Sequence, residues 1–252
     1  MKRLFTLILI CAAMSMAVMS VSCRYHTGHS RTIRIMTFNL HHCEGIDKVY
    51  DVARIAGLIR EQKTDIILCQ EVDRGYSDRS KNDDQPSMLA EMLGYHSYYG
   101  PNIGDTYGNL ILSRFPLESA RNVPLPNPDD KEPRGVIVSM VSINGRRLHL
   151  LDTHLSAFSK ENRDIQVRFL QEMIKKLGNP VIFGADFNCR PSGQLAPLLG
   201  AEYLTSSREK IGIDEAIDDI LISPGLTKHL SNGVVIPTTY SDHPAYWIDI
   251  RL

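Results

Sequence analysis

From residue 31 to its end, the sequence alternates short apolar runs with polar turns. Runs of this length that are rich in β-branched and aromatic residues are typical of β-strands. Two of them, residues 136–143 and 147–152, flank Asn144-Gly145, and this dipeptide is the strongest short signal for a β-hairpin. Further strands are predicted over residues 33–40, 65–70, 109–113, 181–185, 217–222 and 246–250.

Three stretches between these strands have helical patterns. Apolar residues recur at helical spacing over residues 49–62, beginning with Val49, and over residues 159–177. Pro86 and Gly94 delimit a shorter helix over residues 86–93, because proline is favoured in the first helical turn and glycine just after the last. The polar residues 73–85 are predicted to form a long surface loop.

This pattern predicts one α/β domain. The chain has 252 residues, of which 43% are hydrophobic and 23% charged, as is usual for a globular protein. The sequence shows no repeat, low-complexity tract or linker. Strands with interspersed helices predict a sandwich of two sheets with helices packed outside.

The first 22 residues predict an export signal. Lys2 and Arg3 form a short basic start, and the residues that follow to position 21 are almost wholly apolar or small. Small residues precede Cys23, as in a bacterial lipoprotein, where this cysteine is lipidated and becomes the first mature residue. We therefore predict a signal at 1–22, a tether at 23–30 and a domain at 31–252. The protein is expected in the bacterial periplasm or cell envelope, anchored to the membrane through lipidated Cys23.

Two alternatives remain for the leader, which are plain cleavage and an uncleaved anchor, since its apolar run is just long enough to span a bilayer. The leader also affects the charge. It holds two of the 28 basic residues and no acidic ones, so 26 basic residues remain against 29 acidic ones, a net charge of −3. A chain with this balance lacks the electrostatic footprint of a general nucleic-acid binder.

Polar side chains with catalytic potential stand at the ends of several predicted strands. Each of them alone has an ordinary explanation, because Asn, Asp and Ser are favoured in turns. Their shared position at strand ends is what indicates a single site. They are Asn39, Glu71, His154, Asp186, Asn188, Asp218, Asp242 and His243.

Three of these residues have the chemistry of magnesium ligands. Glu71 and Asp242 are hard oxygen ligands of the kind that Mg²⁺ prefers, and Asn39 adds a neutral oxygen. Mg²⁺ uses only one or two carboxylates and takes its other ligands from water and substrate phosphate. A small set of protein ligands is therefore sufficient.

The histidines and the remaining aspartates supply what else phosphoryl transfer needs. His154 and His243 can donate hydrogen bonds to phosphate oxygens. Either Asp218 or Asp186 can orient one imidazole and fix its tautomer. Together with a bound metal, this inventory fits transfer of a phosphoryl group to water.

Seven segments, in order along the chain, carry these residues and their neighbours. They are Thr37-Phe38-Asn39-Leu40, Gln70-Glu71-Val72-Asp73, residues 107–116, Asp152-Thr153-His154-Leu155, Gly184-Ala185-Asp186-Phe187-Asn188, Ile217-Asp218-Asp219 and Ser241-Asp242-His243. In this order they resemble the motifs of the endonuclease/exonuclease/phosphatase (DNase I-like) superfamily. Its members include DNase I-like nucleases, abasic-site endonucleases, sphingomyelinases and inositol-phosphate phosphatases. Each segment alone is a weak signal, whereas the ordered set is specific.

The resemblance implies a four-layered α/β sandwich, with two central, mostly antiparallel β-sheets flanked by helices and a site at one end. It also implies a divalent cation, Mg²⁺ or Mn²⁺. Glu71 falls on the principal metal ligand, Asn39 on a second metal-site position and Asp242 on an additional metal-site carboxylate.

The resemblance implies catalytic roles for the other residues. Asp186 falls on the residue that orients or deprotonates the attacking water, with support from Asn188. Asp218 and His243 fall on an Asp–His pair, and His154 on a second histidine that contacts the phosphate.

We therefore expect an exported, metal-dependent hydrolase of a phosphodiester or phosphomonoester. A small or lipid-derived substrate is preferred over a nucleic acid for two reasons. The loop at 73–85 is mixed in charge, whereas a nuclease is expected to have a basic groove. Nucleases also stack bases on exposed aromatic residues, whereas the single tryptophan, Trp247, lies in a predicted strand. A nuclease acting on DNA or RNA and a catalytically inactive binding module are the alternatives. Arg134 is a weaker candidate for contacting the substrate anion, with an ordinary solvated arginine as the alternative. No protein partner is inferred.

Overall fold

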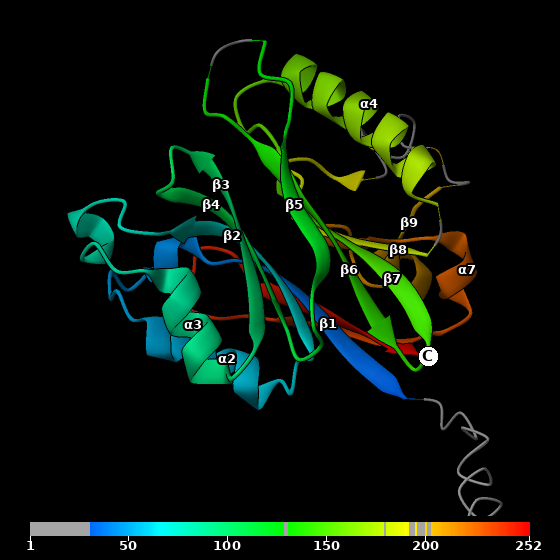
Figure 1. Ribbon diagram of the computed structural model, residues 1–252, viewed down its shortest axis with the longest axis horizontal. Coiled ribbons are helices and arrows are strands. Elements are labelled where there is room, and N and C mark those ends of the chain that lie inside the picture. Colours follow the sequence, from blue (N-terminus) through cyan, green and yellow to red (C-terminus); the bar gives the residue numbers. More distant parts are fainter. Residues whose placement is uncertain (1–30, 129–130, 179, 192–194, 196–199, 201–202) are drawn as a thin grey trace, which may run out of the picture. The chain divides into compact units, whose positions relative to one another are not determined.

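Two six-stranded sheets form the centre of the domain (Figure 1). The computed structural model describes residues 31–252 except 129–130, 179, 192–194, 196–199 and 201–202. The predicted signal, Cys23 and the tether lie outside the described residues. Within the described part of the chain, no helix has the length and apolar character needed to cross a membrane.

The first sheet has the strand order β11-β12-β1-β2-β4-β3 and the second has the order β5-β6-β7-β8-β10-β9. Each sheet has one parallel pair at its centre, β1 with β2 and β7 with β8, and its other pairs are antiparallel. The strands of the first sheet are β1 (Thr32–Asn39), β2 (Ile66–Asp73), β3 (His96–Ile103), β4 (Tyr107–Ser113), β11 (Leu230–Ile236) and β12 (Ala245–Arg251). Those of the second are β5 (Glu118–Pro124), β6 (Gly135–Ile143), β7 (Arg146–His154), β8 (Val181–Asp186), β9 (Thr205–Ser206) and β10 (Asp218–Ile222).

Helices cover the outer faces of both sheets, which completes the four layers that the sequence predicts. Figure 1 shows α2 (Val52–Glu61) and α3 (Gln85–Leu93) outside the first sheet and α4 (Lys160–Leu177) outside the second. Two short helices, α6 (Ser207–Ile211) and α7 (Pro224–Thr227), flank β10 in the sequence.

The central strand β1 has apolar residues on both of its faces. Ile33 and Ile35 belong to the core between the two sheets, whereas Met36 and Phe38 pack under the outer helices. All four side chains are fully buried. A strand covered on both faces loses the alternation of polar and apolar residues, so it reads as one apolar run.

The hairpin prediction is confirmed, and the strands that the sequence did not predict lie at the edges. Asn144 and Gly145 have φ values of 51° and 77°, which is the left-handed geometry of a two-residue hairpin turn. The unpredicted strands are β3, β5, β9 and β11, and these are the four edge strands of the two sheets. Edge strands are half exposed here and carry polar residues, so they lack the apolar run that marks a central strand.

Two helix predictions need correction. The helix predicted from residue 49 begins at Val52, because the carboxylate of Asp51 accepts from the backbone N–H groups of the first turn and caps it, and this leaves Val49 exposed. In the helix predicted over residues 159–177, helical spacing puts Ile165 and Phe169 on the same side as Leu170 and Ile174, yet Ile165 and Phe169 are exposed in α4. Leu170 and Ile174 form part of the face that packs on the second sheet.

The segment 73–85 is more ordered than the predicted surface loop. It contains a short 3-10 turn over Asp78–Ser80. Asp73 at its start is fully buried and accepts from Arg79 Nε at 2.8 Å and Nη2 at 2.6 Å. Gln85 at its end is also fully buried and donates to the carbonyl of His42 at 2.6 Å. These side-chain hydrogen bonds hold the segment in place. Its sequence has no periodic pattern of apolar residues, so this order could not be predicted.

A close approach of the two sheets occurs at Gly184 in β8. A Cβ there would lie 2.5 Å from Leu68 Cδ1 and 3.2 Å from Thr37 Cβ, both in the facing sheet. We expect Gly184→Ala to lower the free energy of unfolding by about 1–3 kcal/mol, because overpacking a dense core forces side chains off their rotamers. Urea unfolding measures this.

Gly57→Ala is the matched control, since a Cβ at Gly57 in α2 would meet nothing within 4 Å. It should stabilise the protein by up to about 1 kcal/mol through helix propensity. A Gly184→Ala variant as stable as the native chain would contradict this account of the sheet contact.

Candidate active site

The topology brings the polar strand ends to one end of the sandwich. The parallel strands β1 and β2 lead to Asn39 and Glu71, and the parallel strands β7 and β8 end at His154 and Asp186. The antiparallel strand β10 begins at the same end with Asp218, which lies opposite Asp186 in the ladder. His243 comes just before β12, which runs antiparallel to β1.

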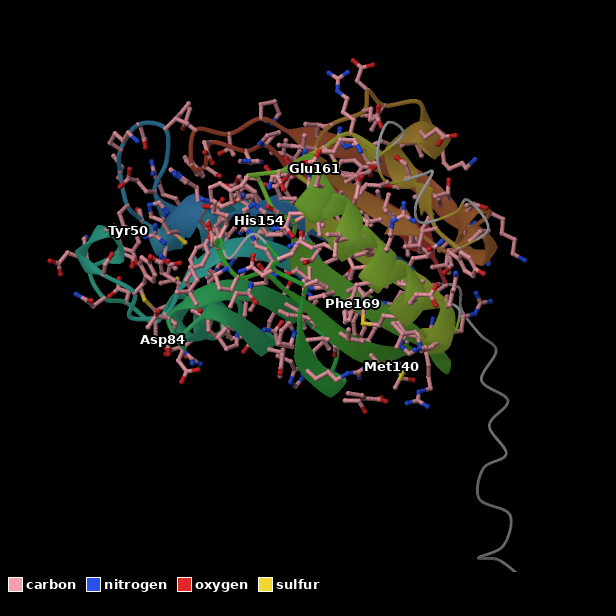
Figure 2. The ribbon with its side chains drawn as sticks, turned by 90° about the horizontal axis from the view of Figure 1, so that it is seen from above. Tyr50, Asp84, Met140, His154, Glu161 and Phe169 are labelled. Atoms are coloured by element: carbon pink, nitrogen blue, oxygen red, sulfur yellow. The ribbon has the colours of Figure 1, made fainter. Side chains whose placement is uncertain are left out.

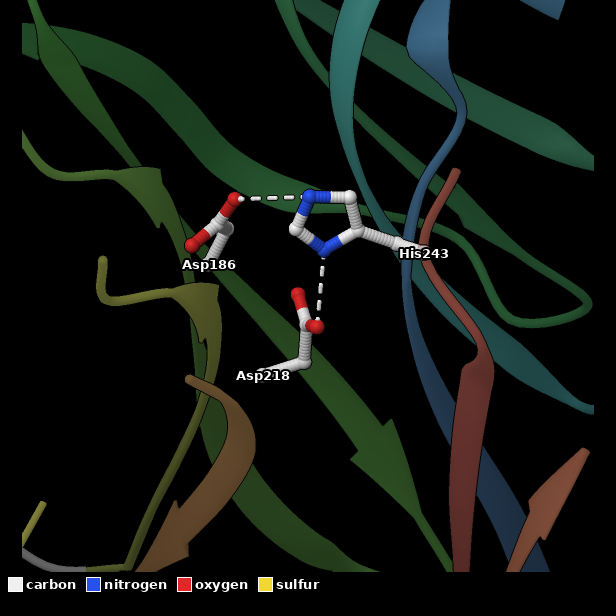
Figure 3. A group of neighbouring side chains, drawn as sticks. All are labelled: Asp186, Asp218 and His243. Atoms are coloured by element: carbon white, nitrogen blue, oxygen red, sulfur yellow. Dashed lines mark hydrogen bonds and ion pairs between the residues drawn. The ribbon is translucent and has the colours of Figure 1, made fainter. Parts of the chain in front are cut away.

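Asp186, Asp218 and His243 form the tightest group (Figure 3). His243 Nδ1 lies 2.9 Å from Asp218 Oδ2, and its Nε2 lies 3.7 Å from Asp186 Oδ2. Both aspartates are buried, with exposed fractions of 1% and 2%. The imidazole of His243 therefore bridges two buried carboxylates.

The two carboxylates keep His243 charged. Burial by itself lowers the pKa of His243, but the hydrogen bond and charge of Asp218, with the charges of Asp186 and Asp242, raise that pKa to about 9. Burial and then the charge of Asp218 raise the pKa of Asp186 to about 6, against the opposing effect of His243. A positive imidazolium thus lies beside the carboxylate expected to take the proton of water.

His154 has the opposite character. Burial, the charge of Arg134 and the charge of His243 hold its pKa well below the usual value, so the imidazole is neutral. Arg134 Nη1 donates to His154 Nδ1 at 2.9 Å, which leaves the imidazole proton on Nε2. This Nε2 lies 3.4 Å from Asp186 Oδ2. Arg134 is itself buried and pairs with Glu132 at 2.9 Å, so it is not a solvated loop arginine.

Asn39 connects the two halves of the site. Its Nδ2 donates to Glu71 Oε1 at 3.0 Å and to Asp186 Oδ2 at 3.1 Å. Its Oδ1 accepts from the backbone N–H of His41 at 3.0 Å. In this orientation the Asn39 amide presents its nitrogen to the carboxylates. A cation at Glu71 would contact the amide oxygen of Asn39 only after the amide group had flipped. The role of Asn39 as a metal ligand stays a prediction.

Glu71 owes its position to a β-bulge. Between Cys69 and Val72 the register of β2 against β4 shifts, so that two residues stand opposite one. Glu71 takes a φ of 57°, which is rare for a residue with a side chain and is found where a strand aims a functional group. Below it, Gln70 Nε2 donates to Asp152 Oδ1 at 2.6 Å and so joins β2 to β7 across the two sheets.

Asn188 and Asp242, the two remaining predicted site residues, lie in different surroundings. The backbone N–H of Asn188 donates to Asp186 Oδ1 at 2.9 Å, and its side chain donates to the carbonyl of Leu155 at 2.9 Å, so Asn188 supports Asp186. Asp242 is 48% exposed, and its Oδ1 lies 3.9 Å from His41 Nδ1. Asp242 influences the pKa of His243 through its charge but does not line the cleft.

A cleft of about 310 Å³ opens above these residues. Glu71, His154, Asp186, Asn188 and His243 line it, as does Arg134. The rest of its wall comes from segments far apart in the chain, and of its residues only Tyr107, which begins the segment 107–116, belongs to one of the seven segments singled out in the sequence. These lining residues are Tyr76, Arg79, Ile103, Tyr107, Glu132, Ala157 and Phe158.

The donor set fits a hard divalent cation at Glu71. The Glu71 side chain is 22% exposed and faces the cleft, where a cation keeps water and phosphate ligands. Among the described residues, Asp186, Asp218 and His243 also bring ligand atoms within 4.8 Å of one another. However, His243 Nδ1 and Nε2 already face the carboxylates of Asp218 and Asp186 at 2.9 and 3.7 Å, whereas the Glu71 carboxylate faces the open cleft. Glu71 is therefore the better place for the cation.

Two sheets with outer helices, and a cluster of acids and histidines at their strand ends, are the arrangement expected for the family that the motifs resemble, whose members are metal-dependent phosphoric ester hydrolases. Residues 36–243 match the model of the Endonuclease/Exonuclease/phosphatase family. The chain therefore belongs to this family, which confirms the resemblance seen in its motifs.

Solved structures share the fold. An endonuclease/exonuclease/phosphatase from Beutenbergia cavernae has 26% sequence identity and a TM-score of 0.76, over 88% of this chain and 72% of that one. A mannosyl-6-phosphatase from Bacteroides thetaiotaomicron has 18% identity and a TM-score of 0.70, over 86% and 98%. A truncated TDP2 from Caenorhabditis elegans has 19% identity and a TM-score of 0.69, over 88% and 98%. Among curated proteins, no significant match to the sequence was found.

Proposed function

We propose that this chain hydrolyses a phosphate ester by in-line attack of a water molecule that Asp186 activates, with Mg²⁺ or Mn²⁺ held at Glu71. The observation that carries this proposal is the convergence of three nitrogen atoms on one carboxylate oxygen. Asn39 Nδ2, His154 Nε2 and His243 Nε2 lie 3.1, 3.4 and 3.7 Å from Asp186 Oδ2. These donors orient the carboxylate toward the cleft and would surround a phosphate oxygen that enters it.

Each residue has a task that its environment supports. Asp186 accepts the proton of the water whose oxygen bonds to phosphorus, while the ester oxygen leaves on the opposite side. The charged His243, held by Asp218, and the Nε2–H of His154 donate to the phosphate oxygens, on which negative charge is spread in the transition state. The cation, when bound, neutralises part of that charge.

The cleft supports a small phosphomonoester or phosphodiester, including a lipid-derived one, over duplex nucleic acid. Its volume of about 310 Å³ is at the lower end for ligand pockets, and the carboxylates of Glu71, Glu132 and Asp186 line it beside Arg79, Arg134 and His243, so it lacks the excess of positive charge that binds duplex nucleic acid. The likeness to a mannosyl-6-phosphatase agrees with a small phosphomonoester. A nuclease acting on DNA or RNA is the alternative.

A substrate panel tests the proposal. The purified protein is assayed on para-nitrophenyl phosphate, bis-para-nitrophenyl phosphate, sphingomyelin, plasmid DNA and an abasic duplex, with Mg²⁺, Mn²⁺ or EDTA. We expect turnover of at least one small ester with Mg²⁺ or Mn²⁺ and none with EDTA. Cleavage of the DNA substrates alone would favour the nuclease, and no turnover of any substrate would favour the inactive binding module.

We also propose that the protein is exported and anchored to the membrane through Cys23. The support is the order of basic, apolar and small residues in the leader. Cys23→Ser should move the protein from the membrane fraction to the soluble fraction after cell disruption, because the lipidated residue is removed. Immunoblots of the two fractions measure this, with Cys189→Ser as the control. Unchanged partitioning of the Cys23→Ser protein would contradict lipid anchoring.

A further inference from the structure

Two aromatic side chains at the mouth of the cleft have no role in the chemistry proposed above. Phe158 is 58% exposed and Tyr76 is 38% exposed, and both line the cleft that holds the candidate catalytic residues. Phe158 lies just before Ser159, which caps α4, and Tyr76 belongs to the ordered segment between β2 and α3. Exposed aromatic rings beside a polar site are suited to contact the apolar face of a bound group.

Tyr76 is held in place before any ligand binds. The Arg79 guanidinium carbon lies 4.3 Å from the centre of the Tyr76 ring, and the Tyr107 ring lies 5.8 Å away. Arg79 is itself fixed by its two hydrogen bonds to the buried Asp73. A ring fixed in this way loses little freedom when a ligand stacks on it.

The cations of the cleft are already engaged with carboxylates. Arg79 pairs with Asp73 and Arg134 with Glu132. His243 pairs with Asp218. Among the described residues that line the cleft, the other basic side chain is His154, whose Nε2 lies 3.4 Å from Asp186 Oδ2. The positive charges of Arg79, Arg134 and His243 are therefore each compensated by a carboxylate within 2.9 Å, and none of them is left uncompensated for a second phosphate.

We propose that the cleft binds monophosphate esters whose other part is an uncharged ring bearing hydroxyl groups, such as a sugar or the ribose of a nucleoside. Tyr76 and Phe158 contact the apolar face of the ring, and the Glu132 carboxylate accepts from its hydroxyl groups. This inference rests on the proposed function and narrows its substrate class. A polyanion such as an oligonucleotide would place further phosphates against Glu132 with no free arginine to receive them.

The test compares kcat/KM values of the Mg²⁺-loaded protein on mannose 6-phosphate, adenosine 5′-monophosphate, glycerol 3-phosphate and a single-stranded oligonucleotide. The ring-bearing monophosphates should exceed glycerol 3-phosphate by about tenfold or more, a difference typical of one good aromatic contact. The ratio of kcat/KM for mannose 6-phosphate to kcat/KM for adenosine 5′-monophosphate distinguishes a sugar ring from the ribose of a nucleoside.

Variants assign the preference to the two aromatic residues. Phe158→Ala and Tyr76→Ala should each reduce the ratio of ring-bearing to glycerol substrate about tenfold, mainly through KM. Phe158→Tyr and Tyr76→Phe keep a ring and should keep the ratio. Phe169→Ala, an exposed phenylalanine on α4 outside the cleft lining, is the matched control and should leave the ratio unchanged (Figure 2).

Four results would overturn the inference. Equal kcat/KM for mannose 6-phosphate, adenosine 5′-monophosphate and glycerol 3-phosphate, or unchanged ratios in the alanine variants, would remove the aromatic subsite while metal-dependent hydrolysis stands. A preference for the oligonucleotide would do the same. No metal-dependent turnover of any ester would remove the proposed function as well.

Discussion

Replacing Asp186 by asparagine is expected to lower kcat by about 10²–10⁴-fold, the usual contribution of a general base. The amide has nearly the same shape as the carboxylate but cannot accept the proton of the attacking water. Asp186 is buried and its two oxygens accept from Asn39 Nδ2 and from the backbone N–H of Asn188, so the amide keeps the volume of the side chain but loses one of these two hydrogen bonds. Steady-state kinetics on a small phosphate ester with saturating Mg²⁺ measure the effect.

Asp105→Asn provides the matched control, because the Asp105 side chain is 86% exposed and pairs with Arg74 at the surface only. Its kcat should equal that of the native protein. Thermal unfolding of both variants separates a chemical effect from a loss of structure. An Asp186→Asn variant with native kcat would contradict the assignment of the base.

Replacing Glu71 by glutamine is expected to lower kcat/KM about 100-fold or more at fixed Mg²⁺ and to raise the Mg²⁺ concentration needed for half-maximal activity. The substitution removes the carboxylate charge at which the cation is placed, and even outer-shell changes cost a metal site 10-fold to about 100-fold. Titration of activity with Mg²⁺ and calorimetric Mg²⁺ binding measure the two effects.

Glu91→Gln, an exposed position on α3, serves as the control and should titrate like the native protein. If Glu71→Gln bound Mg²⁺ as tightly as the native chain, the cation would have to be placed elsewhere. The group of Asp186, Asp218 and His243 would then be the next position to test.

The sequence alone was sufficient for the central layers of the fold but not for its edges. Central strands such as β1 are covered on both faces, and their apolar runs follow directly from that burial. β3 and β11 depend on pairing with a neighbour along one side, and half-exposed strands of this kind have no distinctive period. The exposed Ile165 and Phe169 on α4 show that apolar spacing predicts a helix more reliably than the side of it that is buried.

The candidate site could be predicted to a large extent because polar residues at strand ends are brought together by topology. Once β7 and β8 are parallel neighbours, His154 and Asp186 must lie side by side. The contact of Arg134 with His154, the bulge at Glu71 and the outlying position of Asp242 could not be predicted in this way. They depend on side-chain packing between segments that are distant in the sequence.

Hydrolysis of the small phosphate ester that the substrate panel shows to be turned over, measured on EDTA-treated protein while Mg²⁺ is added back, tests the central claim most directly. The account predicts no turnover in EDTA, recovery as Mg²⁺ is restored, and no comparable recovery in the Asp186→Asn variant at any Mg²⁺ concentration. Turnover that persists in EDTA, or equal recovery in that variant, would contradict a metal-dependent hydrolysis in which Asp186 activates the water.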